Sequence, residues 1–220
     1  MKAIIFDFDG TLADTIPAIT VGVNNALREM GHPSRTCSEV LGFINHGARE
    51  LIRQALPPEY RDDAGYVDRA LVIYNRTYAA AHLQTTCTYP GMDALVADLH
   101  RSFRIGVLSN KQTFLLTDLT AQVLPAGSYD AVQGFESDHP GKPDPYLSRK
   151  IAAQLGVDPS ECVMVGDSDV DILTARNAGM AHIGVSWGYR SAEFLYAAGA
   201  SRVVSTVPEL AAALRPASGL

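Results

Sequence analysis

Two short apolar runs in the chain end abruptly in acidic residues. The first, residues 4–6, leads into Asp7 and Asp9, and the second, residues 162–165, leads into Asp167. Uninterrupted apolar runs of this length are typical of strands buried on both faces of a parallel sheet. Because ligands of an open parallel sheet bind beyond the carboxyl ends of its strands, we expect the two acidic segments to face one site.

Beyond Thr15 the apolar residues recur at helical spacing, and no strand pattern occurs before about Leu83. The pattern predicts a helix with Thr15 as N-cap that ends at Gly31, followed by helices at about residues 38–44, 47–56 and 67–78. An all-helical block of this length is too long for a simple crossover between strands. We therefore expect an inserted helical domain and a second domain built from both flanking segments, with the bounds 15–84 for the first and 1–14 with 85–220 for the second.

From Tyr89 onward the predicted helices and strands alternate. The strands are expected at residues 104–108, 129–134, 162–165, 181–185 and 202–204, and the helices at 92–101, 112–124, 145–155, 170–178, 191–198 and 208–214. This alternation predicts an α/β fold with a doubly wound parallel sheet and right-handed crossovers. Residues 216–220 are expected to form a frayed tail.

Asp7 and Asp9 are two positions apart, so on a continuing strand their side chains point the same way, about 6.6 Å apart along the chain. Gly10 allows the backbone to turn sharply beside them. A buried acid pair is costly unless a cation or a proton relieves the repulsion. The alternative is an acidic turn after an edge strand, with both carboxylates in water. The second acidic strand end favours the buried arrangement, and oxygen ligands of this kind predict a magnesium-type cation site.

Four short motifs follow one another in a fixed order: Asp7-Phe8-Asp9-Gly10-Thr11-Leu12, Leu108-Ser109-Asn110, Lys142-Pro143-Asp144-Pro145 and Gly166-Asp167-Ser168-Asp169-Val170-Asp171. This ordered set resembles the haloacid dehalogenase superfamily on its phosphatase branch, and the phosphoglycolate-phosphatase-like subgroup in particular. The likeness extends from the second residue to about Val207. It implies a Rossmann-like catalytic core with a helical-bundle cap inserted after the first strand.

The resemblance also implies roles for the motif residues. Asp7 would be the nucleophile that forms an aspartyl-phosphate, and Asp9 the general acid and base. Ser109 and Lys142 would assist catalysis, and the phosphoryl group would be bound by Thr11, Ser109, Asn110 and Lys142. Magnesium would be held by Asp7, Asp9, Asp167 and Asp171, with Asp9 contributing its backbone carbonyl.

Several of these residues have a structural alternative. Asp171 falls in the first turn of a predicted helix, where the helix dipole favours an acid. Ser109-Asn110 is also a common turn after a strand. Lys111 resembles the residue that follows Ser-Asn in the phosphoglycolate-phosphatase-like subgroup, but it is equally explained as a solvated lysine at a helix start.

The predicted cap would select the substrate. Its segment at residues 42–50 resembles the cap loop that faces the core site, and Arg49 is the first candidate for binding a substrate carboxylate or phosphate, with Asn45 and His46 behind it. The alternative is a surface arginine paired with Glu50 or another neighbour. The predicted cap contains no lysine, which argues against a Schiff-base phosphonoacetaldehyde hydrolase.

Composition narrows the class further. The 220 residues are 47% hydrophobic and 19% charged, as in ordinary globular domains, and the net charge of −6 argues against a nucleic-acid partner. Cys37, Cys87 and Cys162 are odd in number and widely spaced, which favours free thiols in a reducing compartment. No signal segment or bilayer-spanning run is evident, so we expect a cytoplasmic protein without a membrane partner, as a monomer or homodimer.

The resulting hypothesis is a Mg²⁺-dependent phosphatase of a small phosphorylated metabolite, with 2-phosphoglycolate as the best single substrate. One alternative is a phosphotransferase of the beta-phosphoglucomutase type, which would share the core residues. Another, from a different class, is a phospho-accepting signalling module like a receiver domain. The acids on the first strand and the helical insertion argue against the receiver.

Overall fold

The structure is a computed structural model that describes residues 1–44 and 47–215, without the side chains of residues 80–85. Asn45, His46 and the predicted frayed tail at 216–220 therefore lie outside the described residues, as does the side chain of His82. The chain divides into two compact units, Met1–Asp14 with Thr88–Leu220 and Thr15–Cys87. The helical unit thus ends at Cys87, whereas the sequence analysis ended it at residue 84.

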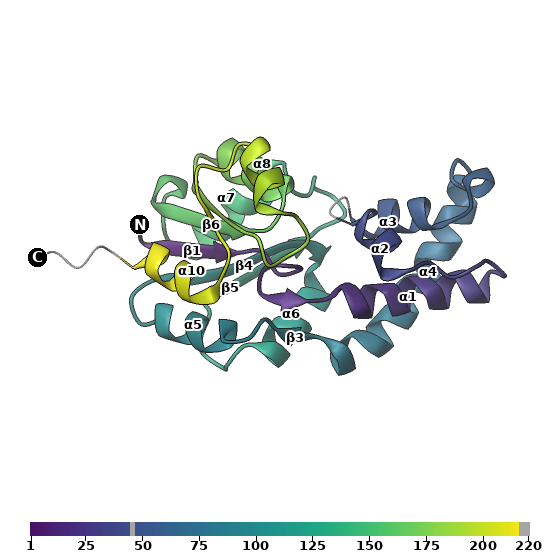
Figure 1. Cartoon of the computed structure of the whole chain (residues 1–220), viewed down its shortest axis with the longest axis horizontal. Helices are drawn as coiled ribbons and strands as arrows, with labels where there is room; N and C mark the ends of the chain where they lie inside the picture. Colours follow the sequence, from purple (N-terminus) through teal and green to yellow (C-terminus); the bar gives the residue numbers. More distant parts are fainter. Residues whose placement is uncertain (45–46, 216–220) are drawn as a thin grey trace, which may run out of the picture. The chain divides into compact units, whose positions relative to one another are not determined.

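The first unit is built on a six-stranded sheet in the order β5-β4-β1-β6-β7-β8, whose paired strands all run parallel (Figure 1). The strands are β1 Ala3–Phe6, β4 Arg104–Gln112, β5 Ala131–Phe135, β6 Cys162–Gly166, β7 Ala181–Val185 and β8 Val203–Val204. From β1 the chain proceeds outward through β4 and β5, then returns to β6 on the other side of β1. The predicted doubly wound α/β fold is confirmed, and the strand order changes direction beside β1.

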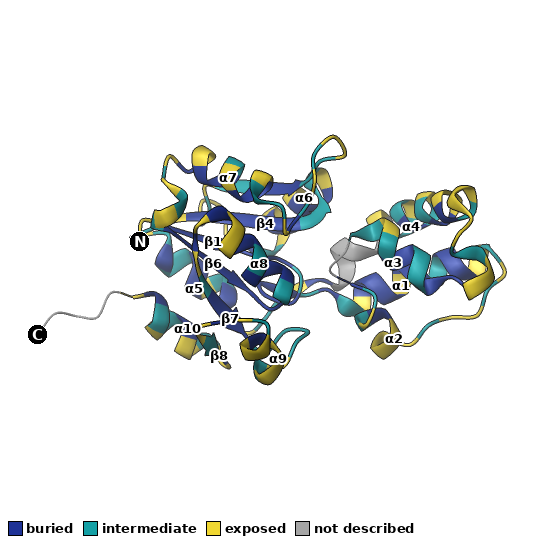
Figure 2. Cartoon of the chain, turned by 90° about the horizontal axis from the view of Figure 1, so that it is seen from above, coloured by how far each residue is buried: buried dark blue, intermediate teal, exposed yellow. Residues whose placement is uncertain are grey.

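Alternate residues of β1 pack into different layers, which explains its continuous apolar run. Ile4 and Phe6 belong to the core that contains the inward faces of α5 Met92–Leu99, α6 Thr113–Val123 and α10 Val207–Leu214. Ala3 and Ile5 belong to the core beneath α7 Pro145–Gln154 and α8 Asp169–Ala178. Helices therefore cover both faces of the sheet, and buried residues fill its centre (Figures 1 and 2).

The second unit is helical, as expected. Its elements are α1 Ile16–Glu29, α2 Cys37–Leu41, α3 Ala48–Ala55, the short 3₁₀ helix η1 Pro58–Tyr60 and α4 Ala64–Thr85. Tyr74 and Tyr78 of α4 are buried and stacked, with ring centroids 5.4 Å apart, and a Cβ on Gly22 of α1 would lie 3.1 Å from each. These tyrosines are core residues of the unit.

Some local predictions differ from the structure. β4 continues to Gln112 instead of ending at Leu108, and its register against β5 shifts between these residues. Thr15 is the N-cap residue of α1, as predicted, but it makes no side-chain cap hydrogen bond. The sequence analysis missed the two-stranded sheet of β2 Ala13–Asp14 and β3 Cys87–Thr88, the 3₁₀ helices η1 and η2 Pro159–Glu161, and it set α9 Ala192–Ala197 slightly too long. Among the described residues no helix has the length and apolar character needed to cross a bilayer.

Candidate active site

The candidate site lies where β1, β4 and β6 end. Asp7 follows β1, and its backbone N–H donates to the carbonyl of Val165 on β6 at 2.9 Å. Ser109 occupies the carboxyl-terminal part of β4, and Asp167 directly follows β6. The predicted convergence of acids from two separate apolar runs is therefore present at one edge of the sheet.

Lys142 lies between two of these acids. Its Nζ is 2.7 Å from Oδ1 of Asp7 and 2.7 Å from Oδ1 of Asp171, and only 4% of its side chain is exposed. Burial alone would lower the pKa of Lys142, but the charges of Asp171 and Asp7 outweigh burial and raise it. The raised pKa favours the charged ammonium form of Lys142 next to the expected nucleophile.

Asn110 fixes the backbone of Lys142. The Lys142 N–H donates to Oδ1 of Asn110 at 2.7 Å, and Nδ2 of Asn110 donates to the Lys142 carbonyl at 3.0 Å. A Cβ on Gly141 would lie 2.6 Å from the same Oδ1, so this contact is tight. The side chain of Asn110 therefore positions the lysine, and its predicted contact with the phosphoryl group stays a prediction.

Asp167 accepts one protein hydrogen bond on each carboxylate oxygen. The Thr11 hydroxyl donates to Oδ1 at 3.1 Å, and the backbone N–H of Tyr189 donates to Oδ2 at 2.7 Å. Thr11 is fully buried and its hydroxyl orients Asp167, while the phosphate-binding role that the sequence analysis gave it stays a prediction. Burial, followed by the charge of Asp171, raises the pKa of Asp167 to about 7.

Asp171 has the first-turn position that the sequence analysis gave as its structural alternative, and its role toward a metal stays a prediction. It is the third residue of α8 and closes a capping box, because its Oδ2 accepts from the Ser168 N–H at 3.1 Å and from the Ser168 hydroxyl at 2.6 Å. Its Oδ1 contacts Lys142. The first-turn position therefore aims one oxygen of a fully buried carboxylate into the site.

Asp9 lies beside a second lysine. Its carboxylate accepts from the Ser109 hydroxyl at 3.2 Å and lies 3.3 Å from Nζ of Lys111. The Lys111 side chain is only 8% exposed and belongs to β4. The alternative of a solvated lysine at a helix start is therefore wrong, and Lys111 is the residue whose importance the sequence analysis underestimated.

The donor set suits a hard divalent cation. Carboxylate oxygens of Asp7, Asp167 and Asp171 lie within 4.8 Å of one another, and all three residues are buried. Asp9 adds a fourth carboxylate, and the ammonium groups of Lys142 and Lys111 contact three of the four. Burial, followed by the charge of Asp171, raises the pKa of Asp7 well above its usual value although Lys142 opposes the shift. This excess of negative charge and the oxygen-only ligands fit Mg²⁺.

Arg49 lies in the helical unit, on α3. Its Nε donates to Oδ1 of Asp68 on α4 at 3.0 Å, while Glu50 pairs with Arg53 at 2.7 Å. Arg49 is thus paired with a neighbour, and that neighbour is not Glu50. Both partners are more than half exposed, and such a pair contributes about 0–1 kcal/mol. The substrate-binding role of Arg49 stays a prediction.

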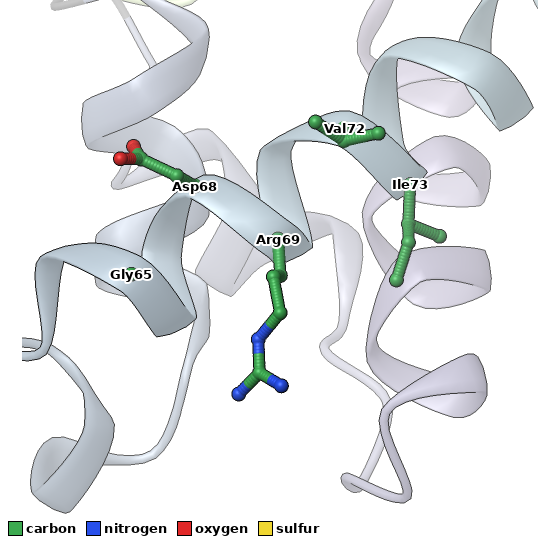
Figure 3. A pocket seen from close by; sticks show the side chains of 5 residues that line it. All are labelled: Gly65, Asp68, Arg69, Val72 and Ile73. Carbon is green, nitrogen blue, oxygen red and sulfur yellow. The ribbon is translucent and has the colours of Figure 1, made fainter.

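Two other features of the described residues, a groove and a group of possible metal ligands, are weaker candidates for a functional site. A shallow groove along α4 is lined by Gly65, Asp68, Arg69, Val72 and Ile73 (Figure 3). Its charged groups are engaged, since Asp68 pairs with Arg49 and the Arg69 guanidinium lies 4.9 Å from the centre of the Tyr66 ring. A surface group of Glu136, Asp138 and His139 lacks the burial of the three aspartates, and Glu136 is neutralised by Lys150.

Comparison with known proteins agrees with this geometry. A family model described as haloacid dehalogenase-like hydrolase matches residues 4–185. The plasmid phosphoglycolate phosphatase of Cupriavidus necator is 34% identical over 218 residues, which cover 98% of this chain and 94% of the relative. The phosphoglycolate phosphatase of Vibrio vulnificus (strain CMCP6) is 32% identical over 220 residues, covering 96% and 94%.

A solved structure of a protein from Lactobacillus delbrueckii subsp. bulgaricus superposes with a TM-score of 0.89 at 31% identity, and covers 97% of this chain and 98% of that one. The chain belongs to the haloacid dehalogenase-like hydrolases. Within that family it is an enzyme of the phosphatase type, similar to phosphoglycolate phosphatases.

Proposed function

We propose that the protein is a Mg²⁺-dependent phosphomonoesterase that hydrolyses a small phosphorylated metabolite through a phospho-aspartate on Asp7. The observation that carries the proposal is the placement of Asp7. Its carboxylate lies 2.7 Å from Lys142 and shares a buried group of oxygens with Asp167 and Asp171, while Asp9 lies two residues away with its own partners.

The first half-reaction divides between Asp7 and Asp9. A carboxylate oxygen of Asp7 attacks phosphorus, the bond from phosphorus to the ester oxygen breaks, and Asp9 donates a proton to the leaving alkoxide. Lys142, held by Asn110, neutralises charge on the phosphoryl oxygens in the transition state. Mg²⁺ bound by the aspartates would supply further positive charge to the same oxygens.

The second half-reaction reverses the role of Asp9. As a base, it takes a proton from a water molecule whose oxygen attacks phosphorus, and the bond between phosphorus and the Asp7 oxygen breaks to give inorganic phosphate. Asp9 suits both steps because its carboxylate is partly exposed, whereas Asp7 is 6% exposed. Ser109 donates to Asp9 and accepts from the Lys111 N–H at 3.1 Å, which fixes its hydroxyl next to the acid.

The best single substrate is 2-phosphoglycolate, the compound named for both enzymes from Cupriavidus necator and Vibrio vulnificus. Such a substrate carries a carboxylate beside its phosphate and therefore needs a second cation. Lys111, buried beside Asp9, is the cation that the first unit offers for it. Arg49 is a further candidate in the helical unit, which we propose as the substrate-selecting cap.

The cytoplasm is the proposed location. All three cysteines are free thiols, with Cys37 and Cys87 exposed, which supports the expected reducing compartment.

The proposal is tested by Mg²⁺-dependent phosphate release from a panel containing 2-phosphoglycolate, hexose phosphates and nucleotides. Asp7→Asn should abolish release, while Asp118→Asn, which changes an exposed aspartate of α6 in the same way, should not. Release that persists without Mg²⁺, or in Asp7→Asn, would refute the proposed chemistry. Isomerisation of a sugar phosphate without phosphate release would favour the phosphotransferase instead.

A further inference from the structure

The segment after β7 contacts the candidate metal site at two points. The indole N–H of Trp187 donates to the Thr11 carbonyl at 3.2 Å, and the N–H of Tyr189 donates to Oδ2 of Asp167 at 2.7 Å. Thr11 in turn donates its hydroxyl to Oδ1 of Asp167. Both carboxylate oxygens of Asp167, an expected metal ligand, are therefore held by hydrogen bonds, one from Thr11 and one from Tyr189. Trp187 in turn holds the backbone of Thr11.

Gly188 allows this arrangement because a side chain would not fit there. A Cβ on Gly188 would lie 2.2 Å from the Gly10 carbonyl oxygen and 2.5 Å from Cβ and Oδ2 of Asp167. Gly10 is similarly confined: its φ is +79°, and its Cβ would lie 2.4 Å from Oδ2 of Asp167 and 2.8 Å from Cδ2 of Tyr189. Two glycines from distant parts of the chain thus enclose one carboxylate.

We propose that Trp187, Gly188 and Tyr189 form a positioning clamp that sets the affinity of the site for its divalent cation by fixing the Asp167 carboxylate. The identity of the cation as Mg²⁺ rests on the proposed function. Outer hydrogen bonds to metal ligands orient them, and their loss typically weakens metal binding by about 10–100-fold. The clamp contacts Asp167 and the backbone of Gly10 and Thr11, so we infer that it acts by positioning the Asp167 carboxylate.

A matched pair of variants isolates the contact from Tyr189. Tyr189→Pro removes the backbone N–H that binds Asp167, whereas Tyr189→Ala removes the ring and keeps the N–H. Gly188→Ala adds the excluded Cβ. Trp187→Phe keeps an aromatic ring and removes the indole donor, so it carries the test if Gly188→Ala or Tyr189→Pro fails to fold.

The measurement is calorimetric titration of MgCl₂ into the full chain, with circular dichroism to confirm folding. We expect Gly188→Ala and Tyr189→Pro to weaken Mg²⁺ binding at least about tenfold, Trp187→Phe to weaken it measurably, and Tyr189→Ala to bind more tightly than Tyr189→Pro. Phosphate release by the weakened variants should recover as Mg²⁺ is raised, which general damage to the fold would not allow.

Folded Gly188→Ala, Tyr189→Pro and Trp187→Phe with wild-type Mg²⁺ affinity would overturn the clamp. Activity that stays low at saturating Mg²⁺ would overturn it as well. A wild-type chain that neither binds Mg²⁺ nor releases phosphate would instead refute the proposed function, so the two failures are distinguishable. Trp187 is the single tryptophan of the chain. A change in its fluorescence during the wild-type titration would therefore report independently that Mg²⁺ binding affects the clamp.

Discussion

Asn110 holds Lys142 by both of its backbone polar groups, at 2.7 and 3.0 Å, across a sequence separation of 32 residues. The lysine that faces Asp7 is therefore positioned by a side chain of β4, a strand that is distant in sequence from the lysine's own loop. Asn110 links β4, which also provides Ser109 and Lys111, to the only buried ammonium group in contact with Asp7 among the described residues.

Asn110→Ala should therefore impair catalysis through Lys142. We expect kcat to fall by roughly 10²-fold, the size of effect that a misplacement of about 1 Å can produce. The unpaired Lys142 N–H and carbonyl should also lower the free energy of unfolding by about 1–3 kcal/mol. Asn177→Ala is the matched control, because Asn177 bonds the carbonyl of Pro143, the next residue, and is exposed. Equal kcat values for the two variants would contradict this role of Asn110.

Mg²⁺ should stabilise the protein more as the pH rises. The pKa of Asp167 is about 7 and that of Asp7 is also raised, against an ordinary value of 3.8, so the folded chain binds more protons than the unfolded chain between these values. The free energy of unfolding without the cation therefore falls as the pH rises through this window. A cation replaces those protons, so the increase in Tm caused by Mg²⁺ should be larger at about pH 8 than at about pH 5.5. An increase that is independent of pH would contradict the raised pKa values.

His182 should make the free energy of unfolding fall as the pH falls, which is opposite to the effect of Asp7 and Asp167. A His182 variant can isolate this contribution. Burial lowers its pKa below 6.5, only partly opposed by the charge of Asp171, and neither ring nitrogen has a hydrogen-bond partner within the described residues. Between the lowered pKa of folded His182 and the ordinary value of 6.5, the unfolded chain therefore binds more protons than the folded chain. The free energy of unfolding falls as the pH falls through this range. Relative to wild type, His182→Leu should gain up to about 1.4 kcal/mol of unfolding free energy per pH unit on acidification, measured by urea denaturation. A constant difference between the two proteins would contradict the shifted pKa.

Lys111 should lower KM for substrates that carry a carboxylate in addition to their phosphate. Lys111→Met removes the ammonium group beside Asp9, and the loss of a charged hydrogen bond of about 1.5–3 kcal/mol should raise KM for 2-phosphoglycolate by roughly 10–100-fold. A phosphate monoester whose alcohol part carries no charge should show a smaller change in KM. Lys150→Met serves as the control, because Lys150 pairs with Glu136 outside the site. An equal change for both substrates would show that Lys111 acts on Asp9 or phosphate and not on the carboxylate.

The sequence was sufficient for the architecture and for the acids because both depend on local pattern. Strand β1 ends directly before Asp7, and β6 ends directly before Asp167. In a parallel sheet the carboxyl ends of neighbouring strands lie at the same edge of the sheet, so the two acids were expected to meet there. The Ser168 and Asp171 spacing of a capping box was also readable, although the sequence analysis did not use it.

The remaining assignments depended on contacts between distant segments. Thr11 and Asp167 are separated by 156 residues, and no local pattern indicates that this hydroxyl holds a carboxylate. Lys111 was ambiguous because β4 extends past Leu108, which buries a lysine that would be solvated at a helix start. The two-residue strands β2 and β3 are too short to show any period.

Intact-mass analysis after rapid acid quenching tests the central claim most directly. The protein is mixed with Mg²⁺ and 2-phosphoglycolate, quenched at successive times within the first turnover, and digested to locate any adduct. The account predicts a transient phosphoryl adduct on Asp7 that appears before inorganic phosphate accumulates and is absent from Asp7→Asn. Phosphate release at full rate with no adduct at any time, or with an adduct on another residue, would contradict it.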